Sequence, residues 1–200
     1  MLKMIKGVKI NDSDKLNEEY MITENCIMAN IDANKILKII NDFVDIQEDP
    51  LFLIIEVPTN EKDEGIEGNT IKELHKDVYY LDNMPKPFAK ELLKTFGNLF
   101  INDGLSQIGI GNHVSNAEIM TDKYNVIEIF NGKDKIDNYE KLMDKYKIKK
   151  VEDLVTAWAF FSDSNPGKCI YAEEDGKSVY DAIEVLTKEA GLYFAERRED

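Results

Sequence analysis

The stretch from residue 99 to residue 130 constrains the fold most, because several short runs that favour β-strands follow one another there. Two of these runs are joined by Asp103-Gly104, a pair typical of the two-residue type I′ turn of a β-hairpin. A second hairpin is expected within residues 118–130. In the first hairpin four apolar residues share a face that must be buried: Leu99, Ile101, Ile108 and Ile110. We therefore predict a central antiparallel β-meander over residues 99–130.

The charge of the chain narrows the classes of partner. Its 200 residues, 43% hydrophobic and 32% charged, suit a soluble globular protein with a sizeable core. The formal net charge is −14. Sequence-independent binding to nucleic acid or to an anionic membrane requires clustered Lys and Arg, so we expect neither. An acidic balance permits a basic partner, although it also serves solubility alone.

Cysteine usage and hydropathy predict the compartment. Cys26 and Cys169 lie far apart with no CxxC spacing, which favours reduced thiols over a disulfide framework. The first residues lack the apolar run of a signal peptide, and no window approaches 18 apolar residues. We expect a cytoplasmic protein that is not membrane-bound.

Two elements are expected in the first third of the chain. Asp32 is a suitable N-cap for a helix over 33–44, where apolar residues recur at helical spacing. Residues 51–57 form a near-continuous apolar run that predicts a central strand. The charged segment 58–73 that follows is expected to be a loop.

Three further helices follow from end signals. Prolines 85 and 87 open a helix over 85–96 that we expect Gly97 to end. Asp137 and the Glu three residues later resemble a capping box for the next helix. Ser178 caps a helix to about residue 190, with Gly191 as its stop, and residues 192–197 predict a last strand.

Residues 151–161 fit both a helix and a buried strand. We expect one helical turn followed by strand. The segment contains Trp158, Phe160 and Phe161, an aromatic cluster that we interpret as a core anchor rather than as a platform for a ligand.

These elements mix helices and strands without strict alternation, so the predicted class is α+β. We expect a mainly antiparallel sheet with the meander at its centre and four to five helices packed on it. The chain is interpreted as a single domain, 1–200. The alternative is two lobes, 1–83 and 84–200, divided at Pro85 and Pro87.

Fragments of nucleotide-binding motifs do not amount to a site. Gly176-Lys177-Ser178 lacks the first glycine of a phosphate-binding loop, and three carboxylates precede it, so Ser178 is interpreted as a helix cap. Gly109-Ile110-Gly111 leads toward another strand rather than a helix. No cofactor is expected.

A serine triad and a metal site are also not expected. Asp103, Ser106 and His113 are close in sequence, but Ser106 should lie on the buried face of a strand. His75 and His113 are the only histidines, and neither HExxH nor paired-cysteine spacing occurs.

Three residues remain as weak catalytic candidates. Glu56 and Glu128 each interrupt an apolar strand, and alternation either points them outward or buries them with a raised pKa suited to acid–base chemistry. His113 lies in a loop of glycine, amide and imidazole groups at a strand end, where functional groups are often found.

Because no catalytic set stands out, we expect a non-enzymatic protein that binds or inhibits a basic partner, as an immunity protein neutralises a cationic toxin. Seven acidic residues are the predicted partner-binding residues: Glu61, Asp63, Glu64, Glu67, Glu173, Glu174 and Asp175.

Two alternatives stay open. One is a small hydrolase or transferase with Glu56, His113 or Glu128 in a cleft beside the meander, which requires these groups to converge within hydrogen-bond reach. The other is a homo-oligomeric structural protein whose last meander strand pairs across a two-fold axis.

Overall fold

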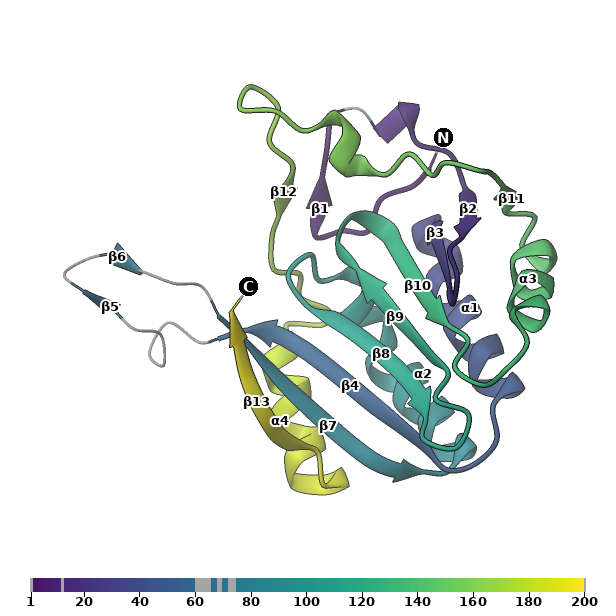
Figure 1. Ribbon diagram of the computed structural model, residues 1–200. Coiled ribbons are helices and arrows are strands. Elements are labelled where there is room, and N and C mark those ends of the chain that lie inside the picture. The colour runs from purple at the N-terminus through teal and green to yellow at the C-terminus, as the bar shows by residue number, and fades with distance from the viewer. Residues whose placement is uncertain (1, 12, 60–65, 68–69, 72–74, 200) are drawn as a thin grey trace.

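A computed structural model describes residues 2–11, 13–59, 66–67, 70–71 and 75–199 of the chain. Within these ranges the main sheet has nine strands in the order β11-β2-β3-β10-β9-β8-β4-β7-β13 (Figure 1). Their bounds are β2 Glu19–Ile22, β3 Cys26–Asn30, β4 Leu51–Pro58, β7 His75–Met84, β8 Gln107–Asn112, β9 Glu118–Asp122, β10 Val126–Phe130, β11 Lys149–Lys150 and β13 Tyr193–Glu199. All neighbours are antiparallel except β11 and β2. The predicted α+β class with a mainly antiparallel sheet is confirmed.

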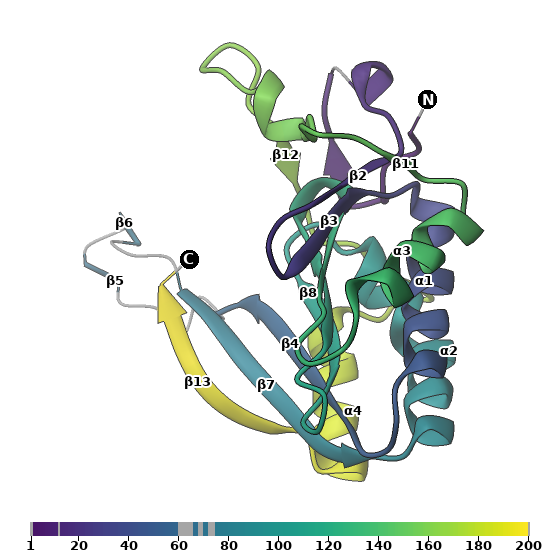
Figure 2. The same ribbon diagram turned by 45° about the vertical axis from the view of Figure 1, so that its right-hand side comes forward.

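The described part of the chain has four α-helices, and they lie on one side of this sheet (Figure 2). They are α1 Ala33–Ile46, α2 Lys86–Asn102, α3 Ile136–Lys145 and α4 Val179–Ala190. Two smaller pairings complete the described strands, β1 Val8–Lys9 with β12 Lys168–Cys169 and β5 Ile66–Glu67 with β6 Thr70–Ile71. Strands that precede Pro85 in the sequence and strands that follow it are interleaved within the main sheet.

Local sequence signals place α1 and α4 correctly. The Asp32 carboxylate accepts a hydrogen bond from the Asn34 N–H at the start of α1. Ser178 and Asp181 form a reciprocal capping box at the start of α4, and Gly191 ends that helix with φ +82°. Both termini follow the expected capping chemistry.

The core lies between the helices and the face of the sheet that they cover. Alternate residues of each strand point into it, such as Ile108 and Ile110 of β8 or Ile127 and Ile129 of β10, and all are at most 1% exposed. On the helix side Phe43 stacks on Tyr139 with ring centroids 5.6 Å apart, which joins α1 to α3.

The first hairpin of the predicted meander is wrong. Residues 99–102 are the last turn of α2, and Asp103 is its C-cap with φ −73°, not a type I′ turn residue. Helix α2 continues past Gly97, the expected stop, and a side chain at this position would meet Leu37 of α1. The absence of a Cβ thus lets the two helices approach closely.

The second hairpin is confirmed. Strands β9 and β10 are joined by a 3-10 turn, Lys123–Asn125, and Val126 lies opposite Asp122. The meander is therefore β8-β9-β10. It does not end at an edge, because β10 pairs with both β9 and β3. The predicted oligomer contact through the last meander strand is wrong for this reason.

Two other local predictions are wrong. Helix α3 begins after Lys135 with no side-chain cap, so Asp137 is inside the helix rather than its cap. Residues 151–161 hold no strand among their described elements, only the 3-10 turn Ala157–Phe160. Trp158 is 54% exposed and is not a core anchor.

Candidate functional site

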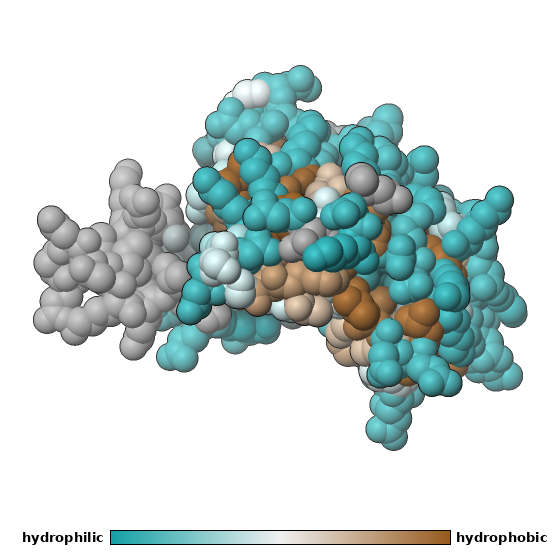
Figure 3. Space-filling model, turned by 90° about the horizontal axis from the view of Figure 1, so that it is seen from above, coloured by the Kyte–Doolittle hydropathy of each residue, from teal (hydrophilic) through white to brown (hydrophobic). Residues whose placement is uncertain are grey.

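The side of the sheet that the helices leave uncovered, here called the open face, carries two glutamates with raised pKa values, Glu118 and Glu128. It is formed by the side chains that alternate with the core residues: Met28, Phe52, Ile54, Glu56, Gln107, Glu118, Met120, Asp122, Val126, Glu128 and Phe130. Figure 3 looks down on the molecule from above, at right angles to the view of Figure 1, and shows apolar surface between hydrophilic side chains.

Two glycines of β8 shape this face. A Cβ on Gly111 would lie 2.2 Å from the Phe52 ring, and one on Gly109 would lie 2.5 Å from the Met120 sulfur. Side chains of β4 and β9 therefore lie over the β8 backbone. Phe52 is only 7% exposed although no helix covers it. The glycines explain how an uncovered face buries apolar side chains.

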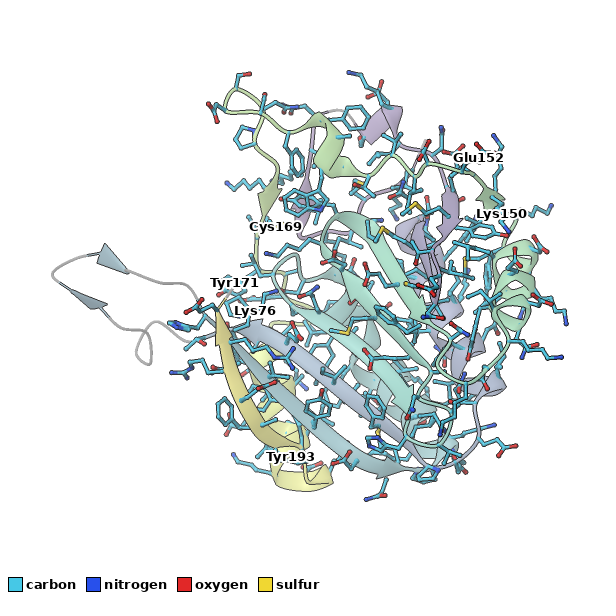
Figure 4. All side chains as sticks on the ribbon, viewed as in Figure 1. Lys76, Lys150, Glu152, Cys169, Tyr171 and Tyr193 are labelled. Carbon is cyan, nitrogen blue, oxygen red and sulfur yellow. The ribbon has the colours of Figure 1, made fainter. Side chains whose placement is uncertain are left out.

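The sheet is curved at the open face. Strands β7 and β13 swing away from the helices (Figure 2), with Lys76 and Tyr193 at opposite ends of this limb (Figure 4). Arg198 of β13 reaches across β7 to the Glu56 carboxylate at 3.2 Å. Lys76 lies 3.9 Å from Glu56 and donates to Gln107 at 2.8 Å. The Glu56 carboxylate is thus neutralised within the fold.

Glu118 has no comparable partner. It lies on β9, opposite Gly111 on one side and Phe130 on the other, and is half-buried. Burial raises the pKa of Glu118, and the nearby Glu56 charge adds to this effect while Arg198 opposes it. Among the described residues no hydrogen bond reaches its carboxylate.

Glu128 is a second half-buried carboxylate on the open face. It lies on β10 between Met120 and Met28. Burial raises its pKa, and the Asp122 charge adds to the shift. No hydrogen bond from the described part of the chain reaches it. Glu118 and Glu128 are diagonal neighbours on adjacent strands, so their β-carbons are about 7 Å apart.

His113 lies at the far end of the open face. Its Nε2 is 3.0 Å from Asp82 of β7, and its ring stacks on Phe52 with centroids 4.5 Å apart. The Tyr193 hydroxyl donates to the same Asp82 carboxylate at 2.7 Å. The hydrogen bond to His113, supported by Tyr193, lowers the pKa of Asp82.

The three predicted catalytic candidates share a face but do not meet. Glu56 is on β4 and Glu128 on β10, with β8 and β9 between them, which separates them by about 14 Å at the usual strand spacing. His113 pairs with Asp82 rather than with either glutamate. This arrangement does not give the hydrogen-bonded carboxylate–imidazole set that the hydrolase alternative requires.

The triad fragment has structural roles. Ser106 is buried and donates to the Phe100 carbonyl at 3.2 Å. The Asp103 carboxylate accepts hydrogen bonds from the backbone N–H groups of Leu105, Ser106 and Ala172. Asp103 therefore fixes the turn after α2 and the segment that leads to α4.

The predicted partner-binding residues fall into two groups. Glu61, Asp63 and Glu64 lie outside the described residues, and for Glu67 only the backbone of β5 is described. Glu173 and Asp175 are exposed before α4, whereas Glu174 is half-buried and pairs with Lys6 at 2.8 Å.

Sequence reasoning missed Glu118 and Arg198. The alternation in residues 118–122 would have placed Glu118 on the same face as Met120, but nothing local indicates that β8 beside it is bare of side chains. Arg198 follows the last strand that the sequence predicts, 192–197, and its pairing with β7 positions it.

Comparisons with family models, curated proteins and solved structures found no match to this chain. No helix in the described ranges is long and apolar enough to cross a bilayer. The described residues bring together no group of three or more His, Cys, Asp or Glu side chains that could hold a metal ion.

Proposed function

We propose that this acidic protein binds, and thereby inhibits, a basic protein partner through its open face, in the manner of an immunity protein in the cytoplasm. The observation that carries the proposal is the pair of half-buried carboxylates, Glu118 and Glu128, to which the described residues offer no hydrogen-bond donor. Partial burial removes water from a carboxylate and costs free energy, and a bound cationic side chain would offset that cost.

The surroundings of these carboxylates support a protein rather than a small-molecule ligand. Met28 and Met120 flank Glu128, and methionine adapts its shape to irregular protein surfaces. Phe130 is 41% exposed beside Glu118. Apolar area around a few desolvated charges is the composition of an interface centre.

The net charge of −14 supports fast, salt-sensitive association with a basic partner. The exposed Glu173 and Asp175 lie on a different segment, before α4. They and the other acidic residues named above stay predictions for additional contacts.

The test is capture from the lysate of the source cells on immobilised protein, at low and high salt. The double variant E118Q/E128Q is compared with E184Q/E189Q, which changes the net charge equally on exposed positions of α4. We expect wild type and E184Q/E189Q to retain a basic protein at low salt and release it at high salt. E118Q/E128Q should lose it. Equal retention by both double variants would contradict the proposal.

A further inference from the structure

Strand β7 has a bulge at the end of the open face where His113 lies. Asp82 and Asn83 of β7 both lie opposite the single residue Phe52 of β4. Asn83 takes the left-handed backbone conformation, with φ +58°. A β-bulge re-aims a side chain, and such irregularities are frequent beside functional sites. The bulge thus determines where the Asp82 carboxylate lies.

The contacts of Asp82 join it to side chains from three other segments. One carboxylate oxygen lies 3.0 Å from the Nε2 atom of His113, and the other accepts a hydrogen bond from the Tyr193 hydroxyl at 2.7 Å. The Tyr193 ring stacks on Tyr80 with centroids 6.5 Å apart. The Phe52 ring packs on Tyr80 at 6.2 Å and on His113 at 4.5 Å. These five residues form one continuous group, here called the Asp82 cluster.

The Asp82 cluster is open to solvent. The side chains of His113 and Asp82 are 56% and 33% exposed, and Tyr193 is 47% exposed. Tyr193 lies at one end of the limb that β7 and β13 form (Figure 4). A side chain from outside can therefore reach the carboxylate and the Tyr193 ring, which a hydrogen bond holds together.

The charge of Asp82 is available to a cation. Among the described residues no Lys or Arg forms an ion pair with it, and Arg198 pairs with Glu56 and Glu196 instead. An ionised carboxylate has about four lone-pair sites, two on each oxygen. His113 and Tyr193 use one site on each oxygen, so each oxygen keeps a site for a further donor. A forked pair of N–H groups requires this arrangement.

The Asp82 cluster is continuous with the proposed binding surface. Burial raises the pKa of Tyr80, and the charge of Glu118 adds to this shift, which places that carboxylate near the cluster. The Phe52 ring lies over Gly111, the residue opposite Glu118. A partner that covers Glu118 can therefore also reach the Asp82 cluster.

We propose that the Asp82 cluster binds an arginine side chain of the basic partner, with the guanidinium paired to Asp82 and stacked on the Tyr193 ring. The inference rests on the proposed function and specifies its partner chemistry. A guanidinium is planar, pairs with a carboxylate through two parallel N–H groups and stacks on aromatic rings. A lysine ammonium is a strongly hydrated point charge that has neither the fork nor the flat face.

The test compares two cationic peptides. Nona-arginine and nona-lysine are titrated into the full-length protein at low salt and neutral pH, and calorimetry measures both affinities. We expect nona-arginine to bind about fivefold more tightly than nona-lysine. Y193L and D82N should each remove this preference. The matched controls Y171L, at a tyrosine that is 52% exposed, and E189Q, at an exposed position of α4, should keep it.

The histidines locate the binding in the wild-type protein. The chain has two, and His75 lies at the opposite end of β7 from Asp82. In NMR spectra the ring signals of His113 should shift when nona-arginine is added, whereas those of His75 should not.

The outcomes separate the two proposals. Equal affinities for the two peptides, or a preference that Y193L and D82N leave intact, would overturn the arginine site. Unchanged His113 signals on binding, or no binding of nona-arginine, would overturn it as well. In each of these cases the lysate capture with E118Q/E128Q decides the proposed function separately.

Discussion

The two faces of the main sheet are built from the same strands and differ in what lies against them. On the covered face, residues such as Ile127 and Ile129 are fully buried under the helices. On the open face, the alternate residue Glu128 is half-buried and no described residue donates to it. The residues of the covered face are thus fully packed within the fold, whereas the open face has carboxylates that could accept hydrogen bonds from a partner.

This difference shows why burial alone does not identify a site. Phe52 and Ile54 on the open face are 7% and 5% exposed, close to core values. Both side chains lie over the glycines of β8, and the rings of His113 and Tyr80 also pack on Phe52. The distinguishing property of the open face is that two of its carboxylates, Glu118 and Glu128, accept no hydrogen bond from the described residues.

The largest expected effect is a difference in the free energy of unfolding between a variant in the core and a variant on the open face. Phe43→Ala removes a fully buried ring that stacks on Tyr139 and should lower the free energy of unfolding by about 3–5 kcal/mol. Phe130→Ala on the open face should cost less than about 1 kcal/mol, because that ring is 41% exposed. Urea denaturation measures both. If both variants lost a similar free energy of unfolding, the contrast between the two faces would be contradicted.

A smaller effect on the free energy of unfolding is expected at the glycines of β8, because open-face side chains occupy the space that a Cβ would fill there. Gly111→Ala places a Cβ 2.2 Å from the Phe52 ring and should lower the free energy of unfolding by about 1–3 kcal/mol. An unchanged free energy of unfolding in Gly111→Ala would contradict the placement of the Phe52 ring against the β8 backbone.

The smallest effect is a dependence on pH. The raised pKa values of Glu118 and Glu128 mean that the folded protein binds these protons more tightly than the unfolded chain. Both groups therefore destabilise the fold at neutral pH, and the cost disappears as pH falls through the raised pKa values. E118Q/E128Q should raise the free energy of unfolding at pH 7 by about 1 kcal/mol. The gain should shrink toward pH 4 in urea denaturation.

Asp82→Asn is the control with the opposite sign. The hydrogen bond to His113 lowers the pKa of Asp82, so its charge stabilises the fold at neutral pH and this contribution is lost as pH falls through that lowered pKa. The variant should be less stable than wild type at pH 7. If the stability of Asp82→Asn and of E118Q/E128Q changed with pH in the same way, the opposite pKa shifts assigned to these carboxyl groups would be contradicted.

The fold could be predicted where local chemistry decides it. The caps of α1 and α4 and the β9–β10 hairpin need only neighbouring residues. The Asp103-Gly104 turn was wrong because tertiary contacts decide there: α2 runs on through Asn102, whose carbonyl accepts from the Gly7 N–H, and the Gly104 N–H donates to the Ile170 carbonyl. Intrinsic preference gives way to packing at such positions.

The site was predicted only in part for a similar reason. Alternation identified Glu56 and Glu128, but whether a strand carboxylate has a partner depends on the next strands. Glu56 meets Arg198 from a strand 142 residues away. Trp158 was expected in the core because large aromatic side chains are usually buried. No local signal in the sequence shows that its segment lies over the end of the sheet.

The most direct test of the open face as the binding surface uses the methionines as paired reporters. Met28 and Met120 lie on the open face, whereas Met84 and Met143 are 2% and 0% exposed in the core. Protein labelled at the methionine methyl groups is titrated with nona-arginine and followed by NMR. The account predicts shifts at Met28 and Met120 that are absent in E118Q/E128Q. Unchanged Met28 and Met120 signals on binding would contradict it.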